Sequence, residues 1–145
     1  MHIEIYTDGG CEPNPGFGAW AAVIIRGGKI TKISGVQENT TNNRMELIAA
    51  LNALRALGEP ARVTVYTDSK YLQQGMTRWL SQWMERDWVT VAGSPVKNAD
   101  IWRELYFVST RHQITWRWVR GHADNEWNNM ANDLVEELLS EELSI

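Results

Sequence analysis

The segments Ile5–Gly10 (IYTDGG) and Val65–Lys70 (VYTDSK) share the tripeptide Tyr-Thr-Asp. Each lies at the end of a stretch in which apolar and polar residues alternate. Such alternation predicts two half-buried strands, each ending at its aspartate. Parallel neighbouring strands end at the same edge of an α/β sheet, and proteins of this class usually build their sites at that edge. We therefore expect Asp8 and Asp68 to lie side by side.

The rest of the chain predicts the overall order βββαβαβα. Further strands are expected at residues 18–26, 29–36 and 113–119, and helices at residues 42–57, 100–112 and 125–143. Asn42 or Asn43 is expected to cap the first helix, which should end at Gly58. Residues 71–96 mix short helical pieces with loop and receive no assignment. The order predicts an α/β fold with a five-stranded mixed sheet, in which three antiparallel strands precede parallel strands and helices cover both faces.

Glu46 lies in the first turn of the helix expected at residues 42–57. It shares a helix stripe with Ala50, Ala53 and Leu57, which should face the sheet, so Glu46 is expected to approach the two aspartates. Carboxylates held close together repel each other, and a divalent cation with oxygen ligands relieves this repulsion. Each acid alone has an ordinary alternative as a cap, a turn residue or a solvated charge. The three together favour a metal site.

Length and composition predict one globular domain spanning residues 1–145. The chain has 145 residues, 43% of them hydrophobic and 22% charged, which is typical of a folded domain. The longest apolar stretch, at residues 17–25, is too short to span a membrane. A single cysteine, Cys11, cannot form an internal disulfide. We expect a monomeric protein of the cytoplasm, with no membrane partner.

The net charge of −4 does not exclude a nucleic-acid partner, because the charge is unevenly distributed. Residues 62–120 contain more Lys and Arg than Asp and Glu, whereas residues 121–145 contain seven acidic residues and no Lys or Arg. A basic surface can therefore coexist with an acidic total. Most of the eight tryptophans also fall in the basic part, where an aromatic ring can stack on a base or fill the core.

Five segments, in this order along the chain, resemble one known family. They are YTDGGCEPNPGFGAWA (6–21), TTNNRMELIAALNAL (40–54), VYTDSKYLQQGMTRWL (65–80), PVKNADIW (95–102) and WRWVRGHADNEWN (116–128). Together they resemble the type 1 ribonucleases H, in the bacterial form that carries a basic, tryptophan-bearing protrusion. The protrusion corresponds to residues 77–97, and the expected fold is ribonuclease H-like.

This resemblance implies endonucleolytic hydrolysis of the RNA strand of RNA/DNA hybrids, with two Mg²⁺ ions, or Mn²⁺ as a substitute, bound by four acidic residues. The products would carry 5′-phosphate and 3′-hydroxyl ends. Asp8, Glu46 and Asp68 match three of the metal ligands. His122 matches a mobile histidine that shuttles a proton or helps product leave, a role that suits imidazole because its pKa of about 6.5 lies near working pH.

The resemblance also implies contacts with the hybrid. Asn14, Asn42 and Asn43 match residues that read the minor groove, where RNA displays its 2′-hydroxyl groups, and Thr41 with the Asn43 backbone matches a pocket for a DNA phosphate. Lys70 stands where the family more often has glutamine. A phosphate contact is therefore expected to replace a groove-reading hydrogen bond at Lys70.

The protrusion departs from the family pattern, because it contains Glu85 and Asp87 and is much less basic. Fewer phosphate contacts imply weaker substrate binding, so we expect the protrusion to act mainly through Trp79 and its apolar neighbours. Cys11 matches a substrate-facing position, and its alternative is an inert small residue.

The fourth metal ligand is the second departure. In the family this carboxylate follows an asparagine by four residues, and four residues after Asn128 this chain has Asn132. Asp133 comes one residue later, and one residue on a helix turns the side chain by about 100°. We read the ligand set as Asp8, Glu46, Asp68 and Asn132, with Asp133 or Asp124 as the alternative fourth member.

Two rival functions remain open. The missing carboxylate at Asn132 motivates a hybrid-binding module with little catalysis. Because a fold alone does not determine function, another metal nuclease or a strand transferase is the second rival. The segments containing NNRMEL and GH favour ribonuclease H, and a cleavage assay on hybrid, duplex DNA and duplex RNA separates the three.

Overall fold

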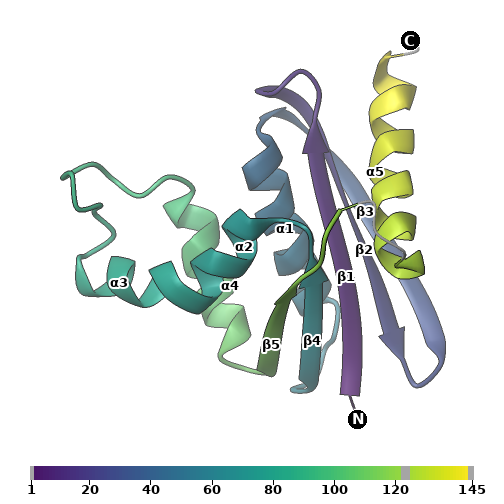
Figure 1. Cartoon of the computed structure of the whole chain (residues 1–145), viewed down its shortest axis with the longest axis horizontal. Coiled ribbons are helices and arrows are strands. Elements are labelled where there is room, and N and C mark those ends of the chain that lie inside the picture. The colour runs from purple at the N-terminus through teal and green to yellow at the C-terminus, as the bar shows by residue number, and fades with distance from the viewer. Residues whose placement is uncertain (1, 122–124, 144–145) are drawn as a thin grey trace.

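The computed structural model describes residues 2–121 and 125–143, which form a helix–sheet–helix arrangement (Figure 1). The elements are β1 (His2–Cys11), β2 (Gly16–Arg26), β3 (Lys29–Thr40), α1 (Asn42–Arg55), β4 (Arg62–Thr67), α2 (Lys70–Gln74), the π-helical turn η1 (Gly75–Trp79), α3 (Leu80–Glu85), α4 (Ala99–Ser109), β5 (Gln113–Trp118) and α5 (Glu126–Leu143). No helix in these described ranges is long and apolar enough to cross a membrane.

The five strands form one sheet in the order β3-β2-β1-β4-β5. The first three strands are antiparallel, and β4 and β5 run parallel to β1 and to each other. The expected mixed sheet is therefore confirmed. In the parallel pair, Tyr6 lies opposite Tyr66 and Thr7 opposite Thr67, so the two YTD segments run side by side in the same register.

The first strand is longer than expected. The prediction that it ends at Asp8 was wrong, because β1 continues to Cys11 by pairing with β2, with Asp8 opposite Ala21 and Cys11 opposite Gly18. The neighbouring strand β4 does end just before its aspartate, at Thr67. Asp8 therefore lies inside a strand, whereas Asp68 follows the end of one.

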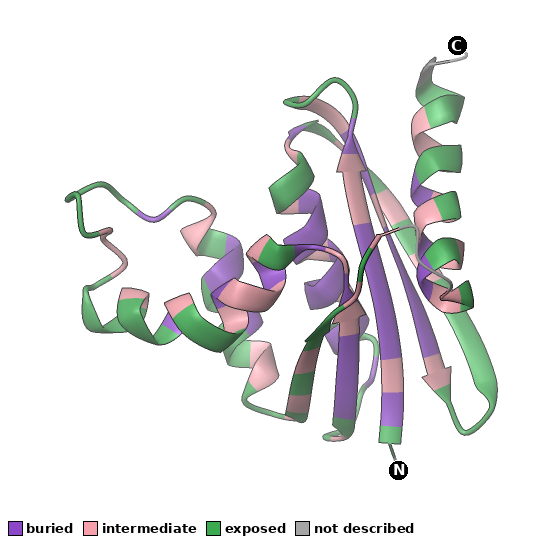
Figure 2. Cartoon of the chain, viewed as in Figure 1, coloured by how far each residue is buried: buried purple, intermediate pink, exposed green. Residues whose placement is uncertain are grey.

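Helices cover both faces of the central strands of the sheet, and these strands are largely buried (Figure 2). The leucine stripe of α1 packs on one face, where Leu47, Leu51 and Leu54 join the β1 and β4 side chains in the main core. Helix α5 covers the other face, where Ala131 packs near Tyr6 and Val23, and Val135 packs near Ala19 and Ala21. This arrangement confirms helices on both faces of the sheet.

The ends of α1 differ from the prediction. Thr41 is the N-cap, and its hydroxyl accepts a hydrogen bond from the Arg44 backbone N–H at 3.1 Å, so Asn42 and Asn43 already belong to the helix. At the other end α1 stops at Arg55 rather than Gly58. Gly58 lies beyond the helix, where its backbone adopts a φ of +77°.

Residues 71–96 form α2, η1, α3 and a following loop, which extend away from the sheet (Figure 1). Gly75 lies against the ring of Trp102, where a Cβ atom would overlap the indole, so glycine allows η1 to pack there. The rings of this region form a chain of contacts with centroid separations from 5.3 to 6.4 Å, made by Tyr71, Trp79, Trp83, Trp88 and Trp102. Trp102 belongs to the main core, and Trp83 and Trp88 pack against it.

Candidate active site

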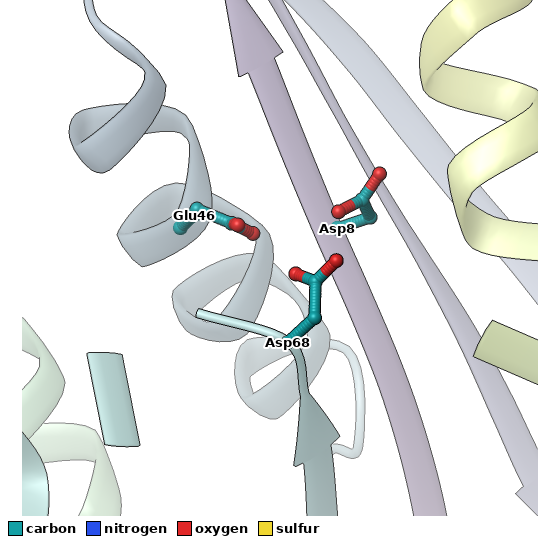
Figure 3. Close-up of side chains that lie close together, drawn as sticks. All are labelled: Asp8, Glu46 and Asp68. Atoms are coloured by element: carbon teal, nitrogen blue, oxygen red, sulfur yellow. The ribbon is translucent and has the colours of Figure 1, made fainter. Parts of the chain in front are cut away.

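Three carboxylates from separate elements meet at the edge of the sheet (Figure 3). Asp8 comes from β1, Glu46 from the first turns of α1, and Asp68 from the turn after β4. One oxygen of each lies within 4.8 Å of the others. Asp8 is 5% exposed and Glu46 9% exposed, so two of the three acids are buried.

Gly9 explains how Glu46 reaches this edge. A Cβ atom on Gly9 would lie 2.5 Å from the Met45 carbonyl carbon and 2.6 Å from the Glu46 backbone nitrogen. Such distances are far below van der Waals contact, so a side chain at Gly9 would push α1 away from β1. Glycine therefore lets the helix backbone lie directly on the strand and brings Glu46 beside Asp8.

Asp68 is held by hydrogen bonds around its backbone. The indole Nε1 of Trp118 donates to the Asp68 carbonyl oxygen at 2.9 Å, and the hydroxyl of Thr67 accepts from the next backbone N–H, that of Ser69, at 3.0 Å. Gly121 lies close to the carboxylate, since a Cβ atom there would be 2.9 Å from Asp68 Oδ2. These contacts fix where the turn after β4 presents its acid.

The electrostatics of the cluster suit a divalent cation. Burial, and then the charge of Asp68, raise the pKa of Asp8 to about 7, against the opposing hydrogen bond from Asn132. Burial, and then the charges of Asp8 and Asp68, raise the pKa of Glu46 well above its usual range. Glu46 Oε1 is buried and has no hydrogen-bond partner among the described residues. Carboxylate oxygens that repel each other, one of them buried without a hydrogen-bond partner among the described residues, fit a cation such as Mg²⁺.

Asn132 lies at the same cluster. Its Nδ2 donates a hydrogen bond to Asp8 Oδ2 at 3.0 Å from α5, on the opposite side of the sheet from α1. Asp133 is exposed and lines a hollow with Lys32 and Glu137 instead. The geometry thus brings Asn132, rather than Asp133, to the acids. Asp124 and His122 lie outside the described residues.

Four of the residues matched to hybrid contacts line one hollow of about 840 Å³. The side-chain oxygen of Asn14 accepts from the Asn42 backbone N–H at 3.2 Å, which joins the loop before β2 to the start of α1. The hollow is bounded on the protrusion side by Trp83 and Lys97. The substrate candidates that line it are Asn14, Thr41, Asn42 and Asn43.

The remaining candidates lie outside this hollow. Cys11 is 8% exposed, and its thiol donates to the Pro13 carbonyl oxygen at 3.1 Å. Burial raises the pKa of this thiol. Trp79 is partly exposed and packs edge-on against Tyr71. Lys70 is exposed and lies over the ring of Trp118.

The sequence patterns missed two residues that build the site. Gly9 was part of the IYTDGG segment, but its close approach to α1 depends on helix–strand packing. Trp118 appeared only as one residue of an alternating strand, and its hydrogen bond to Asp68 depends on the pairing of β4 with β5. A bulky aromatic residue at the last position of that strand was the available signal.

Comparisons with known proteins agree along almost the whole chain. The family model for RNase H matches residues 1–140. The chain is 51% identical over 133 residues to "Ribonuclease H" of Granulibacter bethesdensis, covering 92% of this chain and 89% of that protein. It is 47% identical over 140 residues to "Ribonuclease H" of Francisella philomiragia, covering 97% and 92%.

Among solved structures, the chain is similar to LC9-RNase H1, described as a type 1 RNase H with the type 2 active-site motif. The TM-score is 0.82 at 32% identity, and the match covers 94% of this chain and 71% of that one. Sequence, fold and the acidic cluster at the sheet edge agree. The chain therefore belongs to the RNase H family and is a ribonuclease H enzyme.

Proposed function

We propose that this enzyme hydrolyses the RNA strand of RNA/DNA hybrids endonucleolytically by a two-metal-ion mechanism, leaving 5′-phosphate and 3′-hydroxyl ends. The observation that carries the proposal is the convergence of Asp8, Glu46 and Asp68 within 4.8 Å. The amide of Asn132, 3.0 Å from Asp8, completes a set of four oxygen-bearing side chains.

These four side chains hold the divalent cations, Mg²⁺ or Mn²⁺ as a substitute. When bound, the cations supply an activated water, a hold on the scissile phosphate and charge stabilisation for the leaving 3′ oxygen. Glu46 Oε1, buried with no partner in the described ranges, is an acceptor that folding leaves free for this purpose. The raised pKa of Asp8 reflects repulsion from Asp68 that a cation would relieve.

An activated water is the nucleophile, so the reaction needs no nucleophilic side chain. The chain contributes metal ligands and proton transfer. His122 acts as a proton relay or helps the product leave, because imidazole changes its charge near neutral pH. Glu46 lies near the sugar of the strand to be cut. The close approach of the α1 backbone to Gly9 places Glu46 beside the strand.

Hybrid recognition is assigned to the hollow beside α1. Asn14, Asn42 and Asn43 offer amide donors and acceptors suited to base edges and 2′-hydroxyl groups of the minor groove. Thr41 and the Asn43 backbone take a phosphate of the DNA strand, with Lys97 on the facing side of the hollow. Because only one strand of the substrate has 2′-hydroxyl groups, these contacts distinguish RNA from DNA.

A cleavage assay tests the proposal. Hybrid, duplex DNA and duplex RNA of one sequence, labelled at either end, are incubated with Mg²⁺, with Mn²⁺ or with excess chelator. We expect cutting of the hybrid alone, in its RNA strand, only with a divalent cation, and with the stated ends. Cutting in chelator or of duplex DNA would contradict the proposal.

The second candidate is a hybrid-binding module with little catalysis, and the observation that favours it is the amide of Asn132 in place of a fourth carboxylate. The same assay decides between the two. A chain that binds hybrid tightly but leaves it uncut across a wide range of Mg²⁺ and Mn²⁺ concentrations would be such a module.

A further inference from the structure

Trp118 is the last residue of β5 and lies beside the acidic cluster without belonging to it. Its indole Nε1 donates to the Asp68 carbonyl oxygen at 2.9 Å, and strand pairing places it opposite Thr67. Trp118 is nevertheless 41% exposed. Its indole is therefore anchored by the polar edge next to Asp68 without being buried.

The side chain of Lys70 lies over the ring of Trp118. Its Nζ is 4.9 Å from the centroid of the Trp118 ring, within the range of a cation–π interaction. The ion pairs found within residues 2–121 and 125–143 do not involve Lys70, so its charge is not neutralised by a carboxylate there. The side chain itself is exposed.

The position of this charge matters because of what lies beside it. Lys70 is two residues from Asp68 in the chain, and Asp68 belongs to a cluster of three carboxylates whose negative charge attracts an ammonium group. The cation–π contact with the indole competes with this attraction. It keeps the ammonium group of Lys70 accessible beside the acidic cluster. A nucleic acid must bring its own negative phosphates up to those carboxylates, and an accessible cation offsets the repulsion.

We propose that Trp118 and Lys70 form one substrate-contacting unit, in which the indole face holds the ammonium group of Lys70 where it binds a backbone phosphate of the nucleic acid. Trp118 is a positioning residue that acts through Lys70. The unit rests on the proposed function, since its ligand is the RNA/DNA hybrid that the enzyme cuts. Because every nucleotide carries the same phosphate group, this contact adds affinity without sequence preference.

Salt dependence of binding tests the unit. Affinity for a labelled RNA/DNA hybrid is measured by fluorescence anisotropy in chelator, from about 50 to about 200 mM NaCl. Affinity falls as salt rises, and loss of one phosphate contact makes the plot of log affinity against log salt shallower by about one unit of slope. For Lys70→Met, the loss of affinity over this range should therefore be about three- to fourfold smaller than in the parent.

Lys29→Met is the matched control. Lys29 is an exposed lysine that pairs with Arg26, which in turn pairs with Ile3, so it lies at the far end of the sheet from Asp8. Its removal should leave the salt slope of the parent unchanged. If Lys70→Met and Lys29→Met have the same slope, the proposal is overturned.

Two variants of Trp118 test the positioning role. Trp118→Phe keeps an aromatic face and should keep most of the parental slope, whereas Trp118→Leu should lower the slope as Lys70→Met does. In a Lys70→Met background, Trp118→Leu should change the slope no further. Independent, additive effects of the two substitutions would overturn the coupling. Trp118→Phe and Lys70→Met keep the test decisive if Trp118→Leu fails to fold.

Cleavage of the same hybrid in Mg²⁺ is measured alongside binding. A parent chain that binds hybrid but does not cut it overturns the proposed function, while the slopes still decide the role of Lys70. A parent that cuts hybrid, with equal slopes in all variants, overturns only the Trp118–Lys70 unit.

Discussion

The side-chain amide of Asn132 donates a hydrogen bond of 3.0 Å to Oδ2 of Asp8, so α5 supplies a hydrogen-bond donor to this buried carboxylate. This hydrogen bond opposes the rise in the pKa of Asp8 caused by burial and by Asp68. A carboxylate in the same position would instead repel Asp8. The amide therefore favours folding of the metal-free protein but leaves one fewer negative charge for cation binding.

We expect Asn132→Asp to lower the Mg²⁺ concentration needed for half-maximal cleavage by about tenfold, which is about 1.4 kcal/mol of cation binding. Asn132→Ala, which removes the oxygen, should raise that requirement above the parent. Metal-free, Asn132→Asp should melt below the parent, because a fourth acid adds repulsion. Activity is followed against Mg²⁺ and Mn²⁺ concentration, and melting by circular dichroism.

Asp133→Asn is the control for this series, since Asp133 is exposed and lines another hollow. It should leave the metal requirement unchanged. If the parent and both variants at Asn132 give coincident curves, Asn132 is not in the site, and Asp133 or Asp124 becomes the better fourth ligand.

Stability of the metal-free protein should fall as pH rises. The pKa of Asp8 is raised from 3.8 to about 7, so between these values the folded state binds more protons than the unfolded chain. The contribution of Asp8 is therefore unfavourable above about pH 7 and is lost as pH falls toward 4. The raised pKa of Glu46 extends the decline to higher pH.

Urea unfolding at several pH values in chelator measures this slope, and saturating Mg²⁺ should flatten it because a cation takes the place of the protons. Stability that rises from pH 5 to pH 8 in the metal-free protein would show that the carboxylates do not crowd one another.

Asp8→Asn and Asp68→Asn should each reduce hybrid cleavage by several orders of magnitude without unfolding the chain. Each removes a negative charge from the cluster, so the metal-free variant should melt at or above the parent temperature at pH 8, with each kcal/mol worth about 3 °C in a domain of this size. Cleavage rates and melting curves are compared with the parent. A variant with near-parental activity would exclude its residue from the ligands.

Gly9→Ala should destabilise the protein by more than about 2 kcal/mol and reduce cleavage, because the new Cβ would lie 2.5 Å from the Met45 carbonyl carbon and push α1 with Glu46 off the strand. Gly10→Ala is the neighbouring control. Its Cβ meets the ends of the Val135 and Leu139 side chains at 3.1 and 3.4 Å, which can give way. Urea unfolding of the two variants should therefore differ clearly, and equal losses would contradict the close packing at Gly9.

His122→Ala should slow turnover less than loss of a metal ligand does, because water can relay a proton but cannot replace a carboxylate. Single-turnover and steady-state rates, measured against pH, separate a slower chemical step from slower product release. Inactivity as complete as that of Asp8→Asn would contradict the assigned role.

The predictable part of the site follows from strand register. Two YTD segments in parallel strands can bring their acids together only if Tyr6 lies opposite Tyr66, as it does, with the rings stacked at 4.5 Å. The helix stripe likewise predicted that Glu46 faces the sheet. The alternation within each strand and the stripe on the helix are local periodicities, which a sequence displays directly.

The unpredicted parts depend on contacts between distant segments. Strand β1 extends to Cys11 because β2 continues to pair with it, and three adjacent polar residues could each have capped α1, of which Thr41 does so. Residues 71–96 take their shape from packing on Trp102. The spacing from Asn128 pointed to Asn132, but its contact with Asp8 required α5 to lie on the sheet.

The different settings of the two aspartates in the sheet give them unequal freedom. Asp8 lies within a continuous ladder, with residues on both sides of it paired to β2, and cannot shift without breaking strand pairing. Asp68 follows the last paired residue of β4 and is held by individual hydrogen bonds. Any adjustment of the spacing between the two carboxylates would therefore be easier at Asp68 than at Asp8.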